Sequence, residues 1–391
     1  MISLTTAESA LKDAYLNAVS NQLNTNANPL LAKIKQSSAD VYGKNIIKMA
    51  PIGLNGGVGA GDEVGALPTA KSNRYAQFKT TLKNLYGQIA ITDKAIRASA
   101  SNAGAFVDLL NAEMEGLLTA SKFNLGRMLY GDGTGALATV VSQVDKVITF
   151  NSVKKFVEGM CIDIYNGSTV VVAGLRIMSV DRTNKTITVD TTPGSAVSEG
   201  YVAYVQGSKD YEITGLGAIF GNTATLYGLN RVENGWLTPY TSTAEKEISD
   251  NLLQTAIDYL AENSGSNIDI ITCGAGVRRA YMEYLSCYRR NIDVMNMEGG
   301  YKAVSFNGIP VVADRFVEDN ELYMLDSSKF TLHQLCDWEW IEGENGNILH
   351  QKAGYPTYTA TLVKYADLIC DQPNGQAKFT NIKSSVTNPF A

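Results

Sequence analysis

The residues of this chain that could support a metal site, a disulfide or a phosphate-binding loop are two histidines, five cysteines and two runs of glycine. His333 and Cys336 have a spacing that metal ligands use, but their segment resembles a β-strand, where positions three apart point to opposite faces. The cysteines are widely spread and contain no CxxC pair, so neither a zinc knuckle nor a disulfide framework is predicted. Neither histidine accompanies a nucleophile motif such as GxSxG. We therefore predict no metal site, no cofactor and no enzyme activity.

The two glycine-rich segments lack the context that phosphate binding requires. The glycines between Gly53 and Gly65 are not followed by Gly-Lys-Ser or Gly-Lys-Thr, and no strand leads directly into a helix there. The run from Gly131 to Gly135 ends a helical pattern, whereas a phosphate loop precedes a helix. We interpret the first segment as a flexible loop tip and the second as a helix stop.

The helix that ends at the second run is predicted from Ala105 to Tyr130. Its apolar residues recur at helical spacing and form one stripe that would face a sheet, whereas its charged residues fall mostly off the stripe. The stripe comprises Val107, Leu110, Met114, Leu117, Leu118, Leu125 and Met128, and the charged residues are Glu113, Glu115, Lys122 and Arg127.

The segment from Lys44 to Leu85 has no core of its own. It contains two apolar limbs, around Ile46 and around Phe78, which are joined by the glycine-rich tip and predict two extended arms. Such an arm must bury itself on another molecule. A helix predicted from Thr6 to Leu23, with one apolar stripe and a polar linker behind it, is also expected to dock on a neighbour.

Between Val141 and Ile213 the sequence consists of short β-branched runs separated by turn residues. Six strands are predicted at 147–150, 160–164, 170–172, 175–180, 186–189 and 201–205, which suits a small barrel or sandwich. Beyond it, helices at 244–262 and 277–289 alternate with strands at 267–272, 309–312 and 321–325, as in a compact α/β unit. The first of these helices is expected to be capped by Ser242 with Glu245. Long strands follow at 330–335, 338–341 and 357–370.

Composition limits the classes of function. A chain of 391 residues with 45% hydrophobic and 18% charged residues predicts two or three packed units. No apolar run approaches the roughly 20 residues that span a bilayer. The net charge of −6 argues against a broad basic face that holds nucleic acid. The first residues lack a basic segment followed by an apolar one, so no secretion signal is predicted.

The arm, the segment 85–92, the helix with its Gly-Asp-Gly-Thr-Gly stop, and the run 306–312 followed by 322–326 together resemble the major capsid proteins of tailed phages. The resemblance implies the HK97-like fold, an α+β fold, with an inserted all-β domain. The implied parts are an N-arm (1–43), an E-loop (44–90), a P-domain spine helix (91–140), the β insertion domain (141–213), an A-domain (214–326), P-domain return strands (327–371) and a C-terminal A-domain segment (372–391).

The resemblance also implies a function and partners. The expected role is self-assembly as hexamers and pentamers into an icosahedral phage head that encloses double-stranded DNA without sequence-specific binding and without a membrane. Assembly would take place in the bacterial host cytoplasm, and the protein would reside in the virion. A separate scaffolding protein is expected because only about forty residues precede the arm, together with a portal protein and a decoration protein as a candidate ligand of the inserted domain. Stabilising a neighbouring subunit is the role expected first for that domain.

Charge distribution suggests where neighbouring subunits meet. The arm is basic and the segment from Asp314 to Glu344 is acidic, and complementary charge chiefly selects partner and register. We predict that the arm lies across the acidic edge of the adjacent subunit. The predicted contacts join Lys71, Arg74, Lys79 and Lys83 to Asp337, Glu339, Glu342 and Glu344. Some members of the family cross-link an E-loop lysine to an asparagine; Lys71 is the lysine best placed near the tip, but the other cross-linking residues cannot be matched here.

Two alternatives remain open at this point. An encapsulin-type compartment has the same fold but stores cargo enzymes. A surface- or carbohydrate-binding protein built around the β module would need exposed aromatic side chains there, and Tyr165, Tyr201 and Tyr204 are few and suit strand packing.

Overall fold

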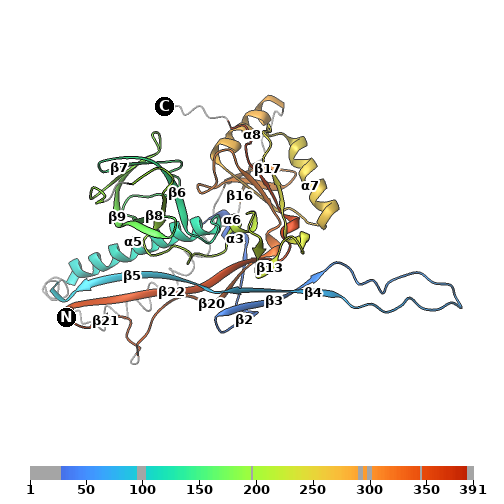
Figure 1. The fold of residues 1–391 in the computed structure, drawn as a ribbon, viewed down its shortest axis with the longest axis horizontal. Helices are drawn as coiled ribbons and strands as arrows, with labels where there is room; N and C mark the ends of the chain where they lie inside the picture. Colours follow the sequence, from blue (N-terminus) through green and yellow to red (C-terminus); the bar gives the residue numbers. More distant parts are fainter. Residues whose placement is uncertain are drawn as a thin grey trace.

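The computed structural model describes residues 28–94, 103–194, 197–288, 294–296, 302–343 and 346–384. The predicted N-terminal helix from Thr6 to Leu23 lies outside these residues, as does Glu344. The molecule is elongated: a long sheet with a helix forms the base, an arm leaves one end, and two compact bodies stand side by side above the base (Figure 1). Over the described ranges, no helix is long and apolar enough to cross a bilayer.

The base is a five-stranded sheet built around one long strand. This strand, β22 (Thr357–Cys370), pairs along one edge with β20 (Phe330–Trp340) and β21 (His350–Gln351), and along the other with β5 (Lys83–Thr92). A short helix, α3 (Pro29–Lys33), leads into β1 (Lys35–Ser37), which runs parallel to β20. The long helix α5 (Ala103–Leu129) lies along the base sheet and confirms the predicted helix. Alternate residues of β5 are buried, as expected for a strand covered on one face.

The arm is a β-hairpin with a long tip. Strands β3 (Asn45–Ile52) and β4 (Arg74–Thr81) pair along their whole lengths, and β2 (Val41–Tyr42) adds a third strand at the base. Residues 53–73 form no strand and project far beyond the body (Figure 1). The prediction of two extended limbs joined by a glycine-rich tip is confirmed. We call residues 53–73 the arm tip.

A closed six-stranded barrel follows α5, in the order β10-β7-β6-β11-β8-β9. Its strands are β6 (Ala136–Val144), β7 (Val147–Phe150), β8 (Cys161–Asn166), β9 (Thr169–Asp181), β10 (Thr186–Val189) and β11 (Val202–Val205). The predicted small barrel is confirmed, but two details were wrong. The runs 170–172 and 175–180 form the single strand β9, in which Gly174 has a left-handed backbone at a register shift of the ladder with β8 and its N–H donates to the side-chain Oδ1 of Asp163 at 2.8 Å. The first strand, β6, starts at Ala136, directly after the glycine run, and was missed.

The second body is a seven-stranded mixed sheet with two helices. The strand order is β14-β23-β19-β15-β18-β17-β16, and the helices are α7 (Asp250–Ser264) and α8 (Ala275–Tyr288). The strands are β14 (Tyr240–Ser242), β15 (Ile270–Cys273), β16 (Val294–Asn296), β17 (Lys302–Phe306), β18 (Ile309–Ala313), β19 (Leu322–Leu325) and β23 (Ala377–Phe379). Short connecting elements are α6 (Leu216–Ile219), β12 (Thr225–Leu226), β13 (Leu229–Asn230), and the 3-10 turns η2 (Gly235–Leu237), η4 (Ser327–Lys329) and η5 (Pro373–Gly375).

One predicted helix start in this body was wrong. Ser242 belongs to β14, which pairs with β23, so it is not available as a helix cap. The helix begins at Asp250 instead, where Ser249 Oγ accepts a hydrogen bond from Leu252 N at 3.1 Å. Two serines with good capping chemistry lie seven residues apart, and sheet pairing decides between them.

Candidate assembly surfaces

Among the residues that the structure describes, no three His, Cys, Asp or Glu side chains come together as metal ligands. His333 is buried, with its Nδ1 2.9 Å from Ala39 O, and burial lowers the pKa of its imidazole. Cys336 lies beyond a register shift of β20 that begins at Gln334, so the strand is irregular between the two residues. The arm offers a different kind of candidate, a surface that could contact another molecule.

The arm tip exposes large apolar side chains to solvent. Leu54, Val58, Val64 and Leu67 are 99%, 89%, 93% and 90% exposed. A folded chain can leave single apolar side chains in water, but four on one projecting segment with no core beneath it mark a surface for association.

The root of the arm is fixed in its own chain. Phe78 is fully buried, and its ring centroid lies 5.3 Å from that of Tyr227 and 5.6 Å from that of Trp236. Thr80 Oγ1 donates to the buried Asp367 carboxylate at 2.7 Å, and the backbone of Thr214 donates to the same group at 2.7 Å. Burial raises the pKa of Asp367, and these hydrogen bonds partly offset that effect. The arm therefore leaves the body in a set direction.

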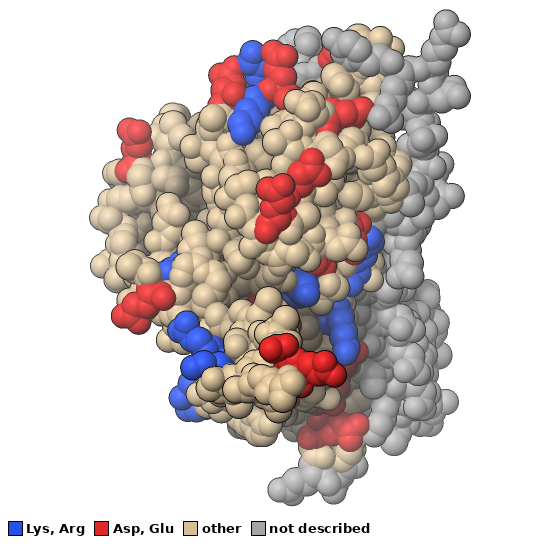
Figure 2. Space-filling model, turned by 90° about the vertical axis from the view of Figure 1, so that its right-hand side faces the viewer, with Lys and Arg blue, Asp and Glu red and all other residues tan. Residues whose placement is uncertain are grey.

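The residues of the predicted charged contacts differ in how exposed they are. Lys71, Arg74 and Lys79 are exposed along the arm, whereas Lys83 Nζ donates to Asp210 O at 3.3 Å within its own chain. On the acidic side, Glu339 and Glu342 are exposed. The end of the molecule from which the arm projects shows Lys and Arg interspersed with Asp and Glu, without a continuous basic patch on this face (Figure 2).

Asp337 differs from the other predicted acidic contacts because it has a partner in its own chain. Its Oδ1 lies 2.7 Å from Nζ of Lys364, a lysine whose side chain is completely buried. Burial lowers the pKa of Lys364, and Asp337 counteracts this by favouring the charged amine. Asp337 therefore holds a buried cation within the base sheet.

A buried ion pair, which the sequence did not predict, joins the segment that leaves the barrel to the long helix. Arg127 of α5 and Glu212, in the segment that leaves the barrel, are both 2% exposed, and Arg127 Nη1 donates to Glu212 Oε2 at 2.9 Å. Arg127 Nη2 donates to Glu212 Oε1 as well, so the pair is bidentate. The charged residues of α5 were expected to fall mostly off its apolar stripe, and Arg127 is nevertheless buried, through this ion pair. No local signal could have shown it, because the partner is 85 residues away.

The barrel also contacts the second body. Ser152 Oγ donates to Glu318 Oε1 at 3.0 Å, and Lys154 Nζ lies 2.8 Å from Val317 O and 3.0 Å from Asp319 Oδ1. The barrel is thus held by its own chain on two sides.

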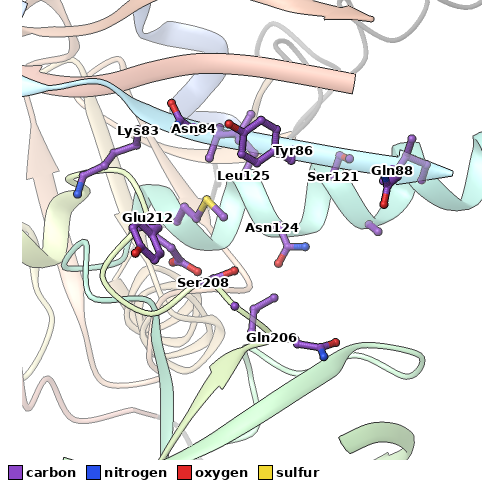
Figure 3. A pocket seen from close by; sticks show the side chains of 18 of the residues that line it. Lys83, Asn84, Tyr86, Gln88, Ser121, Asn124, Leu125, Gln206, Ser208 and Glu212 are labelled. Carbon is purple, nitrogen blue, oxygen red and sulfur yellow. The ribbon is translucent and has the colours of Figure 1, made fainter. Parts of the chain in front are cut away.

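A cleft of about 660 Å³ runs between β5, α5 and the segment that leaves the barrel (Figure 3). We call it the barrel-side cleft. One wall is residues 82–88, and the floor is a face of α5 that includes Ser121 and Asn124. The other wall is formed by residues 205–208 with Tyr211 and Glu212. These three segments are far apart in the sequence, so sequence reasoning could not have assembled them.

Comparison with solved structures finds similar folds in virus shells and in a protein compartment. The capsid of cyanophage A-1(L) aligns over 93% of this chain and 92% of its own, with 12% identity and a TM-score of 0.53. The SrpI encapsulin of Synechococcus elongatus aligns over 92% and 89%, with 9% identity and a TM-score of 0.46. The procapsid of satellite phage P4 aligns over 94% and 90%, with 10% identity and a TM-score of 0.45. No family model matches the sequence, and no curated protein matches it significantly.

Proposed function

We propose that this chain, which has the HK97-like fold of tailed-phage capsid proteins, is a structural protein whose copies assemble into a closed shell. The observation that carries the proposal is the arm, whose root is fixed in its own chain while its apolar tip is left in water by the part of the chain that the structure describes. Burying a leucine or valine side chain contributes about 1.5 to 3 kcal/mol, so four of them favour association with a neighbour even after the entropy of ordering the tip.

The finer parts of the proposal follow the predicted organisation. The base sheet with α5 acts as the P-domain, the seven-stranded sheet as the A-domain, and the arm as the E-loop, with the boundaries predicted above. Copies gather as hexamers and pentamers of an icosahedral phage head in the virion, which encloses double-stranded DNA. A separate scaffolding protein, a portal protein and a decoration protein are the partners we propose, with assembly in the host cytoplasm. The net charge of −6 suits a wall that encloses DNA without binding it tightly.

The alternative of a carbohydrate-binding barrel gains no support. Tyr204 is buried, and Tyr165 and Tyr201 are only partly exposed. The rings of Tyr165 and Tyr204 pack edge to face at 5.1 Å, and Lys209 Nζ lies 4.5 Å from the Tyr165 centroid. These tyrosines are occupied in packing, so they offer no open aromatic platform for a sugar.

The experiment that tests the proposal removes the arm tip. Ile52 pairs directly with Arg74, so an Asn-Gly turn can replace residues 53–73 and close the hairpin. We call this chain the arm-trimmed variant. Sedimentation velocity should show large assemblies for the wild-type chain and only monomers or small oligomers for the arm-trimmed variant. Assemblies of wild-type size from the arm-trimmed variant would contradict the proposal.

Charge reversal tests the predicted contacts between subunits. The double variant Arg74→Glu, Lys79→Glu should impair assembly, because it places acidic side chains opposite Glu339 and Glu342 of the neighbour. The matching reversal Glu339→Lys, Glu342→Lys in the same chain should restore it. Reversal of Arg182 and Lys185, in the turn before β10 of the barrel, is the control with equal change of charge. Unimpaired assembly of the first double variant would count against these contacts.

A further inference from the structure

The arm tip contains a pair of residues whose own atoms can react with each other. Asn55 is followed by Gly56, and both are exposed on a segment that projects away from the body (Figure 1). The side-chain amide of an asparagine can be attacked by the backbone nitrogen of the next residue. Glycine favours this attack because it has no side chain to hinder the approach. The attacking atom here is Gly56 N, and its target is Cγ of Asn55.

The backbone after Asn55 holds these two atoms close together. Asn55 Oδ1 accepts a hydrogen bond from Gly57 N at 2.9 Å, and the turn that this bond closes contains both Gly56 N and Asn55 Cγ. The same hydrogen bond polarises the carbonyl group of the side chain. Negative charge develops on Oδ1 during the attack, so the Gly57 N–H is placed as a donor that stabilises it.

Two other Asn-Gly pairs direct their side-chain amides to different partners. The amide of Asn234 donates to Asn230 O at 2.9 Å, on the preceding turn of the chain. The amide of Asn307 donates to Gln254 Oε1 at 3.1 Å. Both side chains are therefore held by groups other than the backbone that follows them.

Two further Asn-Gly pairs are restrained through their backbones. Gly375 N donates to Gln372 O at 3.1 Å, so the nitrogen that would have to attack Asn374 is occupied. Asn166 pairs with Thr169 where β8 turns into β9, which fixes its backbone in the barrel ladder. Among the Asn-Gly pairs that the structure describes, the pair in the arm tip is thus the one placed to react.

We propose that Asn55 is a site of spontaneous deamidation, which marks copies of this chain whose arm tip stays uncovered. Gly56 N loses its proton and bonds to Cγ of Asn55, and the side-chain nitrogen leaves with a proton as ammonia. Water then opens the resulting cyclic imide at either carbonyl carbon, which gives aspartate or isoaspartate. The overall reaction consumes water, releases ammonia and needs no other reactant.

The product alters the tip where its association depends on apolar contact. Leu54, next to Asn55, is 99% exposed, and Val58 is 89% exposed. A carboxylate beside them would be taken out of water when the tip is covered, and burying a charge without a partner is costly. Isoaspartate also lengthens the backbone. Chains that stay unassembled therefore lose their capacity to assemble, whereas a covered tip is protected. This consequence rests on the proposed function, but the reaction itself does not.

Peptide mapping of the wild-type chain measures the reaction directly. The chain is kept dilute and unassembled at neutral pH in water enriched in heavy oxygen, and is then digested in ordinary water. The tryptic fragment 49–71 should gain the heavy oxygen at Asn55, and Asn166 should stay unchanged over the same time. An unmodified Asn55, or equal conversion at Asn166, would overturn the assignment.

Gly56→Ala is the matched control for this measurement. An added Cβ would meet Lys71 Cγ at 3.6 Å, which is ordinary contact, so the variant leaves the shape of the tip unchanged. It should slow the conversion of Asn55 by about fivefold or more, because the methyl group hinders the attacking nitrogen. An unchanged rate would contradict attack by Gly56 N.

An assembly measurement separates this inference from the proposed function. Asn55→Asp should raise the concentration at which large assemblies appear in sedimentation velocity by about tenfold or more, whereas Asn55→Gln, which keeps an amide, should assemble like the wild-type chain. Conversion of Asn55 should also be slower in assemblies than in the dilute chain. Equal assembly of the two variants, or equal conversion rates, would overturn the marking role. A wild-type chain that deamidates at Asn55 but never assembles would instead refute the proposed function.

Discussion

Asp314 is the carboxyl group whose environment gives the sharpest prediction. It follows β18, is 4% exposed, and meets the end of α5, where Tyr130 is buried. Its Oδ1 accepts from Phe316 N at 3.0 Å, whereas Oδ2, like the hydroxyls of Tyr130 and Thr272, has no well-formed hydrogen bond among the described residues. Burial raises the pKa of Asp314 to about 6, although Phe316 N, Tyr130 and Arg315 each oppose this. A charged carboxylate is therefore disfavoured where the second body packs on the long helix.

The size and sign of the effect follow from proton linkage. The folded pKa of about 6 lies about two units above the ordinary value of an aspartate, which corresponds to about 3 kcal/mol. Between these two pKa values the folded chain binds more protons than the unfolded chain, so the free energy of unfolding falls as the pH rises. Between about pH 4 and pH 7, about 2 kcal/mol of this contribution is lost.

The variant Asp314→Asn removes the titration and keeps a side chain of the same size. Urea unfolding of the arm-trimmed variant, with and without Asp314→Asn, avoids the stabilisation that assembly would add. The free energy of unfolding of the parent minus that of the variant should fall by about 2 kcal/mol between about pH 4 and pH 7. If the amide packs less well than the carboxyl group, it lowers the free energy of unfolding of the variant by the same amount at every pH and leaves this pH dependence unchanged. A difference that is independent of pH would refute the reasoning.

Three further substitutions test other contacts. Arg127→Met should destabilise the arm-trimmed variant by about 3 to 5 kcal/mol in urea unfolding, because it leaves Glu212 buried and unpaired. Adding Glu212→Leu should recover most of the lost stability. If the second substitution recovers nothing, the ion-pair account is contradicted. Phe78→Ala should cost about 3 to 5 kcal/mol and speed hydrogen exchange in β4, whereas unchanged exchange would mean that the root does not fix the arm. Gly274→Ala should cost about 1 to 3 kcal/mol or more in the same unfolding assay, since an added Cβ would lie 2.0 Å from Glu318 O; a neutral effect would show that this turn can relax.

The features that local sequence could predict were those with a regular spacing of apolar residues or with glycines that end an element. The apolar period of α5 and the glycine stop after Tyr130 predicted the helix, and the two apolar limbs around the glycine-rich tip predicted the arm. The barrel followed from short β-branched runs. Its strand count was six both as predicted and as observed, but only because a missed strand, β6, offset a false break at Gly174.

The features that sequence could not predict depend on partners far along the chain. The burial of Arg127 could not be predicted, because its partner, Glu212, lies beyond the whole barrel. Asp337 looked like a free acidic contact because Lys364, which it holds, lies on the next strand of the sheet. The barrel-side cleft needs β5, α5 and the barrel exit to meet, and no single segment carries its signature. Such sites arise from tertiary packing, which residue spacing alone does not reveal.

Electron microscopy of the wild-type chain, expressed alone and together with a scaffolding protein from the same genome, tests the central claim most directly. The account predicts closed shells or sheets of hexamers and pentamers, which the arm-trimmed variant fails to form under the same conditions. DNA within shells recovered from infected cells would then favour a phage head over a storage compartment. A stable monomer in both expressions would contradict the account, because the exposed arm tip would then have no neighbour to bind.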